Sequence, residues 1–528
     1  INAFGFGGVN AHLIVDGPGQ AAPETAPSRR RGDAALLTGL GAAIGDCPDL
    51  NAVARALAAG QPRLRPLPEG RHAGMPFPAP QGAYLDRVAI DALKLRVPPN
   101  DISRMYPQQL LMLSVGDAAL RDAGVAPGSR TAVIIASAMD HSGHRLMARW
   151  ESSWRLEDSL DAAGFELSDE ERRNLTQAVR ESLHNPVDAV VMLSYVGSLL
   201  ASRIAATWDF SGPALMLTGD ETGALRALEL GQRLLAEGEA DAVLVGAIDL
   251  AGAIENLMVR QACGADISAP VGEGACALVL EPADAVRAQG RAAYAEWRGA
   301  GFGESAQAAA ASIRAGIGQD AASAGLVESA GPLPAADLLG GRPALSSAAA
   351  VFGHTRMTAP LLSVLHAALS LSGRSLPAWA GWNGAQIPAG LEEAHAYVPT
   401  DARPWFRPAD GRRVAAVLAR DDDGSSAQAL LAETPAGIAN KAVAPALPLL
   451  LPLAAADRDA LLAQLAAHIA ELEKPAADAA ALCRAAVLAH NPQAPLALAL
   501  VADDAAGLLE EARAALAQLP KAQADWQS

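Results

Sequence analysis

The chain has 528 residues, of which 41 are Lys or Arg and 58 are Asp or Glu, and its formal net charge is −17. This acidic balance excludes a nucleic-acid-binding protein, because contacts with phosphates need a basic surface. Hydrophobic residues make up 51% of the chain, which excludes a disordered polypeptide and is enough for a sizeable core.

The N-terminal segment is apolar and rich in glycine. Its sequence, INAFGFGGVNAHLIV, predicts a loop followed by a strand, and the Pro/Gly/Arg-rich residues 18–32 read as a linker. The glycines do not fit a dinucleotide-binding loop, since such a loop follows a strand and opens a helix. Because the chain begins with Ile1 inside this segment, we expect it to be a piece of a longer protein.

Residues 33–433 alternate between strand-like and helix-like segments. Two long helical patterns are predicted over 107–124 and 222–238. Apolar, β-rich runs occur at 34–40, 131–137, 213–218, 241–250 and 275–281. This alternation favours an α/β domain with helices on both faces of a sheet.

The sequence pattern of residues 434–528, the last part of the chain, predicts a separate module. A second Pro/Ala-rich linker opens it, and two strands at 447–453 and 495–501 alternate with alanine-rich helices. This pattern indicates a small α/β unit.

No segment of the sequence is suited to cross a membrane. The most apolar candidate, residues 442–456, is short and is interrupted by three prolines. The four cysteines lie far apart and form no C-x-x-C pair, which excludes a zinc ribbon or a disulfide framework. Together with the missing signal peptide, this favours a cytoplasmic location.

Several short runs resemble motifs of the β-ketoacyl synthases, the condensing enzymes of fatty-acid and polyketide assembly. They occur in the family's order along the chain. The matching runs are FGFGGVNAH at 4–12, PQQ at 107–109 with DAG at 122–124, SRI at 202–204, SGP at 211–213, VGA at 245–247, GEGA at 272–275 and GHT at 353–355. The resemblance implies a thiolase-like, five-layered α-β-α-β-α domain that normally dimerises. It also implies acyl groups carried by phosphopantetheine on a carrier protein, with no cofactor bound directly.

The family's condensation uses a cysteine at a helix N-terminus, two histidines and a lysine. The helix dipole lowers the pKa of such a thiol, and the histidines stabilise the enolate formed on decarboxylation. The resemblance places Glu221 at the cysteine position, Ala330 at the first histidine and Ala349 at the lysine, and only His354 is retained. The glycine-rich loop that normally lines the site is replaced by residues 419–424.

This pattern resembles the chain-length factors, which are degenerate ketosynthases that pair with an active copy and shape the acyl-chain tunnel. We therefore expect a non-condensing domain at 33–433, within a multidomain polyketide or polyunsaturated-fatty-acid-type synthase. Residues 1–17 resemble the end of a preceding ketosynthase, the expected partner. Residues 434–528 resemble the linker between a ketosynthase and an acyltransferase, so an acyltransferase is a candidate for the domain after Ser528. The resemblance also implies a carrier protein as a partner.

Two other functions are compatible with the same residues. A domain that decarboxylates malonyl groups could use Glu221 and His354, although decarboxylases of this kind keep the histidine that Ala330 replaces. A structural remnant that only holds neighbouring domains in place would use neither residue. In that case Glu221 is simply a tolerated negative charge at a helix start.

Three further sets of residues have competing interpretations. Met147 and Trp150 occupy positions that resemble tunnel-lining ones in chain-length factors, but helix packing explains them equally well. His141 and His144 superficially resemble metal ligands, but no third ligand has suitable spacing, so we expect a solvated loop and no metal site. The acidic run 421–423 predicts a solvated turn rather than a cation site.

Overall fold

The described part of the chain forms two compact units. The computed structural model describes residues 2–4, 10–12, 34–69, 71, 78–139, 141–183, 187–317, 324–331, 342–379, 381–382, 396–408, 411–443, 449–474, 479–502 and 505–521. The units are Ile1–Val443 and Ala444–Ser528, so the division lies after Val443 rather than after residue 433. Most of residues 1–32 lie outside the described residues, and those described include the antiparallel pair β1 (Asn2–Phe4) and β2 (Asn10–His12).

The first half of the large unit is a mixed sheet in the order β3-β8-β7-β5-β6. Its strands coincide with the apolar runs of the sequence, and β3, β5 and β8 are buried along their whole length. The bounds are β3 (Ala35–Ile44), β5 (Thr131–Ser137), β6 (Ala214–Thr218), β7 (Ala242–Leu250) and β8 (Val271–Pro282), with the short β4 (Gly82–Ala83) beside β8.

The second half repeats this arrangement in the order β9-β15-β14-β10-β11. A short antiparallel pairing of β3 with β9 joins the two halves into one sheet of 11 strands among the described residues. The bounds are β9 (Ala295–Gly303), β10 (Leu326–Ser329), β11 (Ala344–Ser346), β14 (Val414–Arg420) and β15 (Ser426–Ala432).

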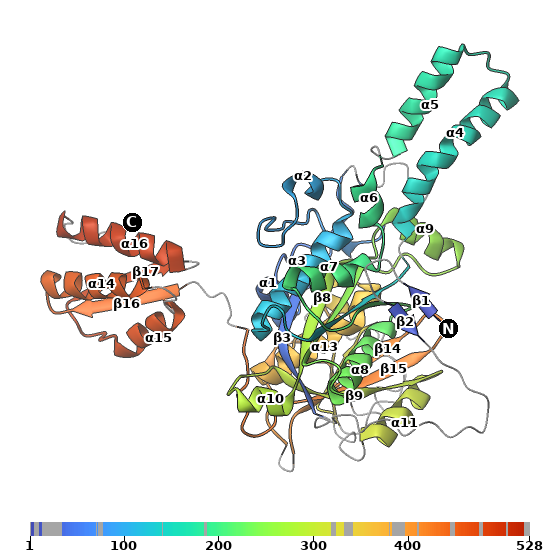
Figure 1. The fold of residues 1–528 in the computed structure, drawn as a ribbon. Coiled ribbons are helices and arrows are strands. Elements are labelled where there is room, and N and C mark those ends of the chain that lie inside the picture. The colour runs from blue at the N-terminus through green and yellow to red at the C-terminus, as the bar shows by residue number, and fades with distance from the viewer. Residues whose placement is uncertain are drawn as a thin grey trace. The chain divides into compact units, whose positions relative to one another are not determined.

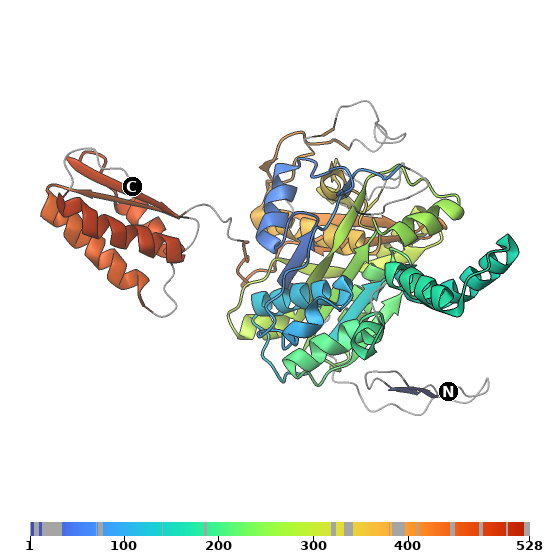
Figure 2. The ribbon, with the colours of Figure 1, turned by 90° about the horizontal axis from the view of Figure 1, so that it is seen from above.

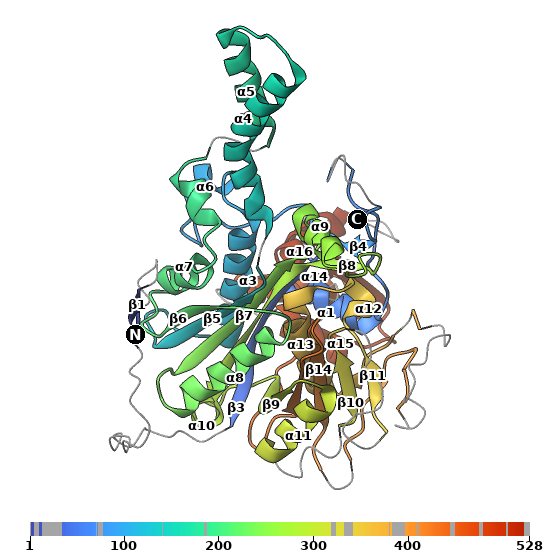
Figure 3. The same ribbon diagram turned by 90° about the vertical axis from the view of Figure 1, so that its right-hand side faces the viewer.

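Helices complete the expected five layers (Figures 1 and 3). Between the half-sheets lie α8 (Gly223–Ala236) and α13 (Ala359–Gly373), while α3 (Pro107–Ala123) and α7 (Leu199–Trp208) cover the first half-sheet from outside and α11 (Ala306–Ile317) covers the second. α3 approaches β3 very closely, since a Cβ on Gly39 would lie 2.3 Å from the carbonyl oxygen of Ala119. The thiolase-like α/β fold is thus confirmed.

The remaining elements of this unit are short, apart from a two-helix arm. In the arm, α4 packs against α5 and both project from the layered body (Figures 1 and 2). The bounds are α1 (Leu50–Ala59), α2 (Pro99–Ile102), η1 (His141–Gly143), α4 (His144–Ala163), α5 (Asp169–Leu183), α6 (Ala189–Ser194), α9 (Ile254–Ala262), α10 (Ala283–Ala288), α12 (Ala349–Phe352), η3 (Arg356–Thr358), β12 (Ser375–Leu376) and β13 (Arg403–Pro404).

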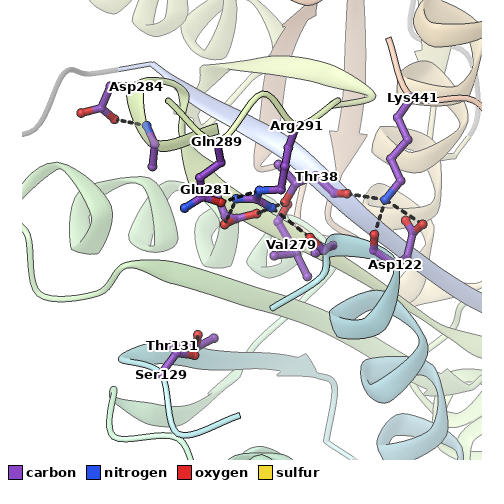
Figure 4. A network of polar contacts seen from close by, with 12 residues as sticks. Thr38, Asp122, Ser129, Thr131, Val279, Glu281, Asp284, Gln289, Arg291 and Lys441 are labelled. Carbon is purple, nitrogen blue, oxygen red and sulfur yellow. Dashed lines mark hydrogen bonds and ion pairs between the residues drawn. The ribbon is translucent and has the colours of Figure 1, made fainter. Parts of the chain in front are cut away.

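A polar network explains why the large unit extends to Val443 (Figure 4). The ammonium of Lys441 lies 2.8 Å from Asp122 Oδ1 and donates to the carbonyl oxygen of Thr38 at 2.9 Å. Beside it, Arg291 pairs with Glu281 at 2.6 Å. The segment that the sequence predicted as linker is therefore fixed to the end of α3 and to β3.

The small unit is a two-stranded antiparallel sheet packed with three helices. Its strands agree with the two apolar runs of the sequence, and its core contains the buried Leu451, Leu465 and Leu508. The bounds are β16 (Leu449–Ala455), α14 (Arg458–Leu472), α15 (Ala479–Ala489), β17 (Leu496–Ala502), α16 (Ala505–Gln518) and η4 (Leu519–Lys521). In neither unit does a described helix combine the length and hydropathy needed to cross a membrane.

Candidate active site

Glu221 lies where the chain turns from β6 into α8. It directly precedes Thr222, the N-cap of α8, and only 4% of the residue is exposed. A carboxylate at this place gains from the helix dipole, but burial removes it from water and calls for a partner. The structure supplies two partners.

Arg356 and His354 both contact the Glu221 carboxylate. Arg356 Nη1 lies 3.0 Å from Oε1, and His354 Nε2 lies 3.3 Å from Oε2. Arg356 has φ +49°, a left-handed conformation that is rare for non-glycine residues. The position expected for the missing thiol is therefore filled by an ion pair.

The backbone fixes the His354 imidazole. The backbone amide of His354 donates a hydrogen bond to the carbonyl oxygen of Pro270 at 2.8 Å. The carbonyl oxygen of His354 accepts one from the amide of Gly272 at 3.0 Å. Gly353 before it has φ +70°, and a Cβ there would lie 2.6 Å from Val271 O, so only glycine fits. The Nδ1 atom accepts a hydrogen bond from the amide of Arg356 at 3.2 Å. Nε2 therefore carries the proton in the neutral ring and can donate it toward Glu221.

Ala330 and Ala349 bring no polar group to the site. Ala330 follows β10 and is buried in the apolar core, and Ala349 is the first residue of α12. The backbone around Ala330 nevertheless lies beside the retained histidine, because a Cβ on Gly331 would be 3.2 Å from His354 Nε2. The scaffold thus brings the segment of Ala330 next to His354, without a side chain at Ala330 that could donate a hydrogen bond.

The acidic run 421–423 belongs to the turn between β14 and β15, and the expectation of a solvated turn is wrong for its first residue. Asp421 is 9% exposed, and its two oxygens accept from the amide and the hydroxyl of Thr222 at 2.8 and 2.7 Å. Asp422 pairs with Arg356 at 2.9 Å. Asp423 is exposed and bonds within the turn to Ser425.

Burial and the charges around Glu221 shift the pKa values of three nearby side chains. Burial raises the pKa of Asp421, and the negative charges of Asp220 and Glu221 add to this rise. The hydrogen bonds from Thr222 act in the opposite direction and lower the pKa of Asp421. The hydrogen bond from Arg356 lowers the pKa of Asp422. Burial, together with the charge of Arg356, lowers the pKa of the Arg260 guanidinium on α9.

Sequence reasoning missed Arg260, Arg356 and the contacts of the acidic turn. One signal was available, because an arginine follows His354 by two residues while a run of aspartates replaces a glycine-rich loop. New charges of opposite sign at positions that converge in the fold indicate a new ion-pair network. The sequence does not show which of these charges meet.

Cys276 and the pair His141 and His144 are the other side chains with chemistry of their own that the structure places. Cys276 lies within the fully buried β8, where burial raises its pKa. The rings of His141 and His144 stack with centroids 5.8 Å apart. Across the described ranges, no group of three or more His, Cys, Asp or Glu side chains could hold a metal ion.

Met147 and Trp150 lie on α4 of the arm, and their side chains are exposed by 56% and 57%. Trp154, one turn further along, is exposed by 69%. The spacing puts all three on one face of the helix. Their role at an acyl-chain tunnel stays a prediction.

Comparison with known proteins agrees with this fold. Residues 36–293 match the family model of the β-ketoacyl synthase N-terminal domain. One of the polyunsaturated fatty acid synthase subunits of Thraustochytrium sp. is 30% identical over 318 residues, which is 53% of this chain and 15% of that protein. The polyketide synthase ThaG of Burkholderia thailandensis is 28% identical over 392 residues, covering 64% of this chain and 6% of ThaG. The chain thus spans only a small part of these relatives.

Two solved structures have the same fold. The PfaC keto synthase–chain length factor superposes with a TM-score of 0.68 at 23% identity, covering 99% of this chain and 51% of that one. The oxazolomycin ketosynthase domain OzmH KS7 of Streptomyces albus superposes with a TM-score of 0.63 at 20% identity, covering 92% of this chain and 88% of that domain. The chain therefore contains a β-ketoacyl synthase-like domain of the kind that polyketide and polyunsaturated fatty acid synthases carry.

Proposed function

We propose that this domain does not condense acyl groups and acts as a chain-length-factor-like partner of an active ketosynthase. The observation that carries the proposal is the buried Glu221 at the start of α8, ion-paired with Arg356 at 3.0 Å. Condensation through an acyl-enzyme needs a nucleophile that forms a thioester, and a carboxylate held in an ion pair is not one. Ala330 and Ala349 also lack the donors that would stabilise an enolate.

The proposed pairing uses an open sheet edge and an exposed helix face. β6 pairs with β5 on one side, and no described strand covers its other side. An uncovered edge strand presents free amide and carbonyl groups to a partner. The solved PfaC chain is named as a ketosynthase and a chain length factor, and this chain covers 51% of it. A ketosynthase is thus the partner we propose, with Met147 and Trp150 facing the acyl chain in the pair.

The proposed substrate is the partner's acyl chain, delivered by phosphopantetheine on a carrier protein, and an acyltransferase is the proposed neighbour after the small unit. The test supplies acyl-thioester and malonyl-carrier protein to this chain alone and to this chain with the ketosynthase. We expect product only from the pair, and a changed product length with Met147→Ala or Trp150→Ala. Condensation by this chain alone, lost in Glu221→Ala, would overturn the proposal.

A second candidate is malonyl decarboxylation, favoured by one contact. His354 Nε2 lies 3.3 Å from Glu221 Oε2, so a histidine and a carboxylate lie side by side. The carboxylates of Asp421 and Asp422 beside them oppose this candidate, because they repel a second anion such as a malonyl group. Carbon dioxide release from malonyl-carrier protein, abolished in His354→Ala, would favour it over the chain-length-factor role.

A further inference from the structure

The β14–β15 turn reaches across to the N-terminus of α8. The turn is closed by hydrogen bonds from the Asp421 amide to Ser425 O at 2.8 Å and from the Gly424 amide to Asp421 O at 3.0 Å. Gly424 takes φ +95°, as such a turn requires. This rigid turn presents Asp421 to Thr222, which is 199 residues away in sequence.

Asp421 takes the hydrogen-bond donors that an anion would use at this helix terminus. An amide in the first turn of a helix is a natural partner for an anion, because it has no acceptor within the helix and the dipole is positive there. Here the Thr222 amide is already bound, at 2.8 Å, by a buried carboxylate. Both oxygens of Asp421 accept hydrogen bonds, which is the pattern of an ionised carboxylate.

The neighbouring carboxylates have protein partners without any added ligand. Asp422 of the β14–β15 turn forms an ion pair with Arg356, and Arg356 also forms one with Glu221. Asp249 Oδ2, on β7, accepts a hydrogen bond from the amide of Met357 at 3.3 Å. A thiolate, an enolate or a malonyl carboxylate placed here would meet several fixed carboxylates in a partly desolvated site.

We propose that the turn Asp421–Ser425 is an internal latch that occupies the anion-stabilising end of α8 and keeps the site unreactive even when a cysteine is restored. This inference rests on the proposed loss of condensation and gives a second cause for that loss. Replacing the cysteine removed the nucleophile, and the latch removed the electrostatic environment that would activate one. Asp421 is the positioning residue of the latch, and Asp423 of the same turn has no contact with α8 among the described residues.

The test restores the thiol and measures its reactivity. Glu221→Cys is made in a Cys263→Ser background, which removes the exposed natural cysteine. The rate of alkylation by iodoacetamide is then compared with and without Asp421→Asn, which keeps the shape of the side chain and removes its charge. We expect Asp421→Asn to raise the rate about tenfold, the effect of lowering the thiol pKa by about one unit. Asp423→Asn, in the same turn, is the matched control and should leave the rate unchanged.

A second measurement does not depend on how well Glu221→Cys folds. Amide hydrogen exchange of the peptide around Thr222 should be faster in Asp421→Ala than in Asp423→Ala. Equal alkylation rates in Asp421→Asn and Asp423→Asn, or equal exchange in the alanine pair, would overturn the latch. Condensation by the unsubstituted chain would instead overturn the proposed function and leave these comparisons unaffected.

Discussion

Arg356 Nη1 lies 3.0 Å from Oε1 of Glu221, and both side chains are largely buried. The two residues are far apart in sequence, so the contact joins the start of α8 to the segment that follows the retained histidine. Removing one member of a buried ion pair is costly, because the other charge stays behind without its partner. This makes the pair a target for stability measurements as well as for activity.

We expect Glu221→Ala to lower the free energy of unfolding by about 2–4 kcal/mol. Asp422 still contacts Arg356 and keeps the loss from being larger. Arg356→Ala should cost a similar amount, and the double variant should cost clearly less than the sum of the two. Urea unfolding of the three variants gives these values. Additive losses would show that the two side chains are not coupled.

The pH dependence of stability should differ in sign between the two aspartates of the turn. The bond from Arg356 lowers the pKa of Asp422 below its ordinary value of 3.8, so the ionised form stabilises the fold. This stabilisation is complete above that value and is lost as the pH falls through the lowered pKa. We therefore expect Asp422→Asn to be less stable than the unsubstituted chain near neutral pH and equal to it in acid. The unfolding free energy, measured from neutral pH down to below the lowered pKa of Asp422, tests this.

Asp421 should behave in the opposite way. Burial raises the pKa of Asp421, so folding favours the protonated form of this side chain. The stability that the protonated form gives to the fold is lost as the pH rises through the raised pKa. Asp421→Asn removes this titration, and its stability relative to the unsubstituted chain should improve as the pH rises. A parallel pH profile for Asp421→Asn and Asp422→Asn would contradict both assignments.

The sequence predicts the first half of the large unit better than the second. The apolar runs at 131–137 and 241–250 became β5 and β7 because strands buried on both faces are continuous hydrophobic segments. β9, with the sequence AEWRGAGFG, has no β-branched residue and is a strand through its pairing with β15. Such strands are specified by tertiary contacts that a local pattern does not contain.

The sequence suggests which residues belong to the site, but it does not show the contacts that they make. The prediction that Glu221 stands at the cysteine position needs only an ordered set of motifs. The network around it joins α8, the segment after His354 and the β14–β15 turn, which are brought together only by the sheet order. Charge alone could not show that Asp421 is buried while Asp423, two residues later, is exposed.

The Lys441 network should set the C-terminal limit of the large unit. Lys441→Met keeps most of the side-chain volume but leaves Asp122 without its cation, and we expect a loss of about 1–2 kcal/mol in unfolding free energy. Lys474→Met is the matched control, because its ion pair with Glu471 is exposed and should contribute almost nothing. Equal effects of the two substitutions would show that residues 434–443 are a linker after all.

Thiol chemistry should distinguish the exposed cysteine from the other three. Cys263 is exposed at the end of α9, whereas Cys47, Cys276 and Cys483 are buried. Burial raises the pKa of Cys47 to about 11, so little of this thiol is ionised at neutral pH. A disulfide reagent should therefore titrate one thiol per folded chain and all four after denaturation. Cys263→Ser should abolish the fast phase, and rapid labelling that persists in this variant would mean that a buried thiol is reached through opening of the fold.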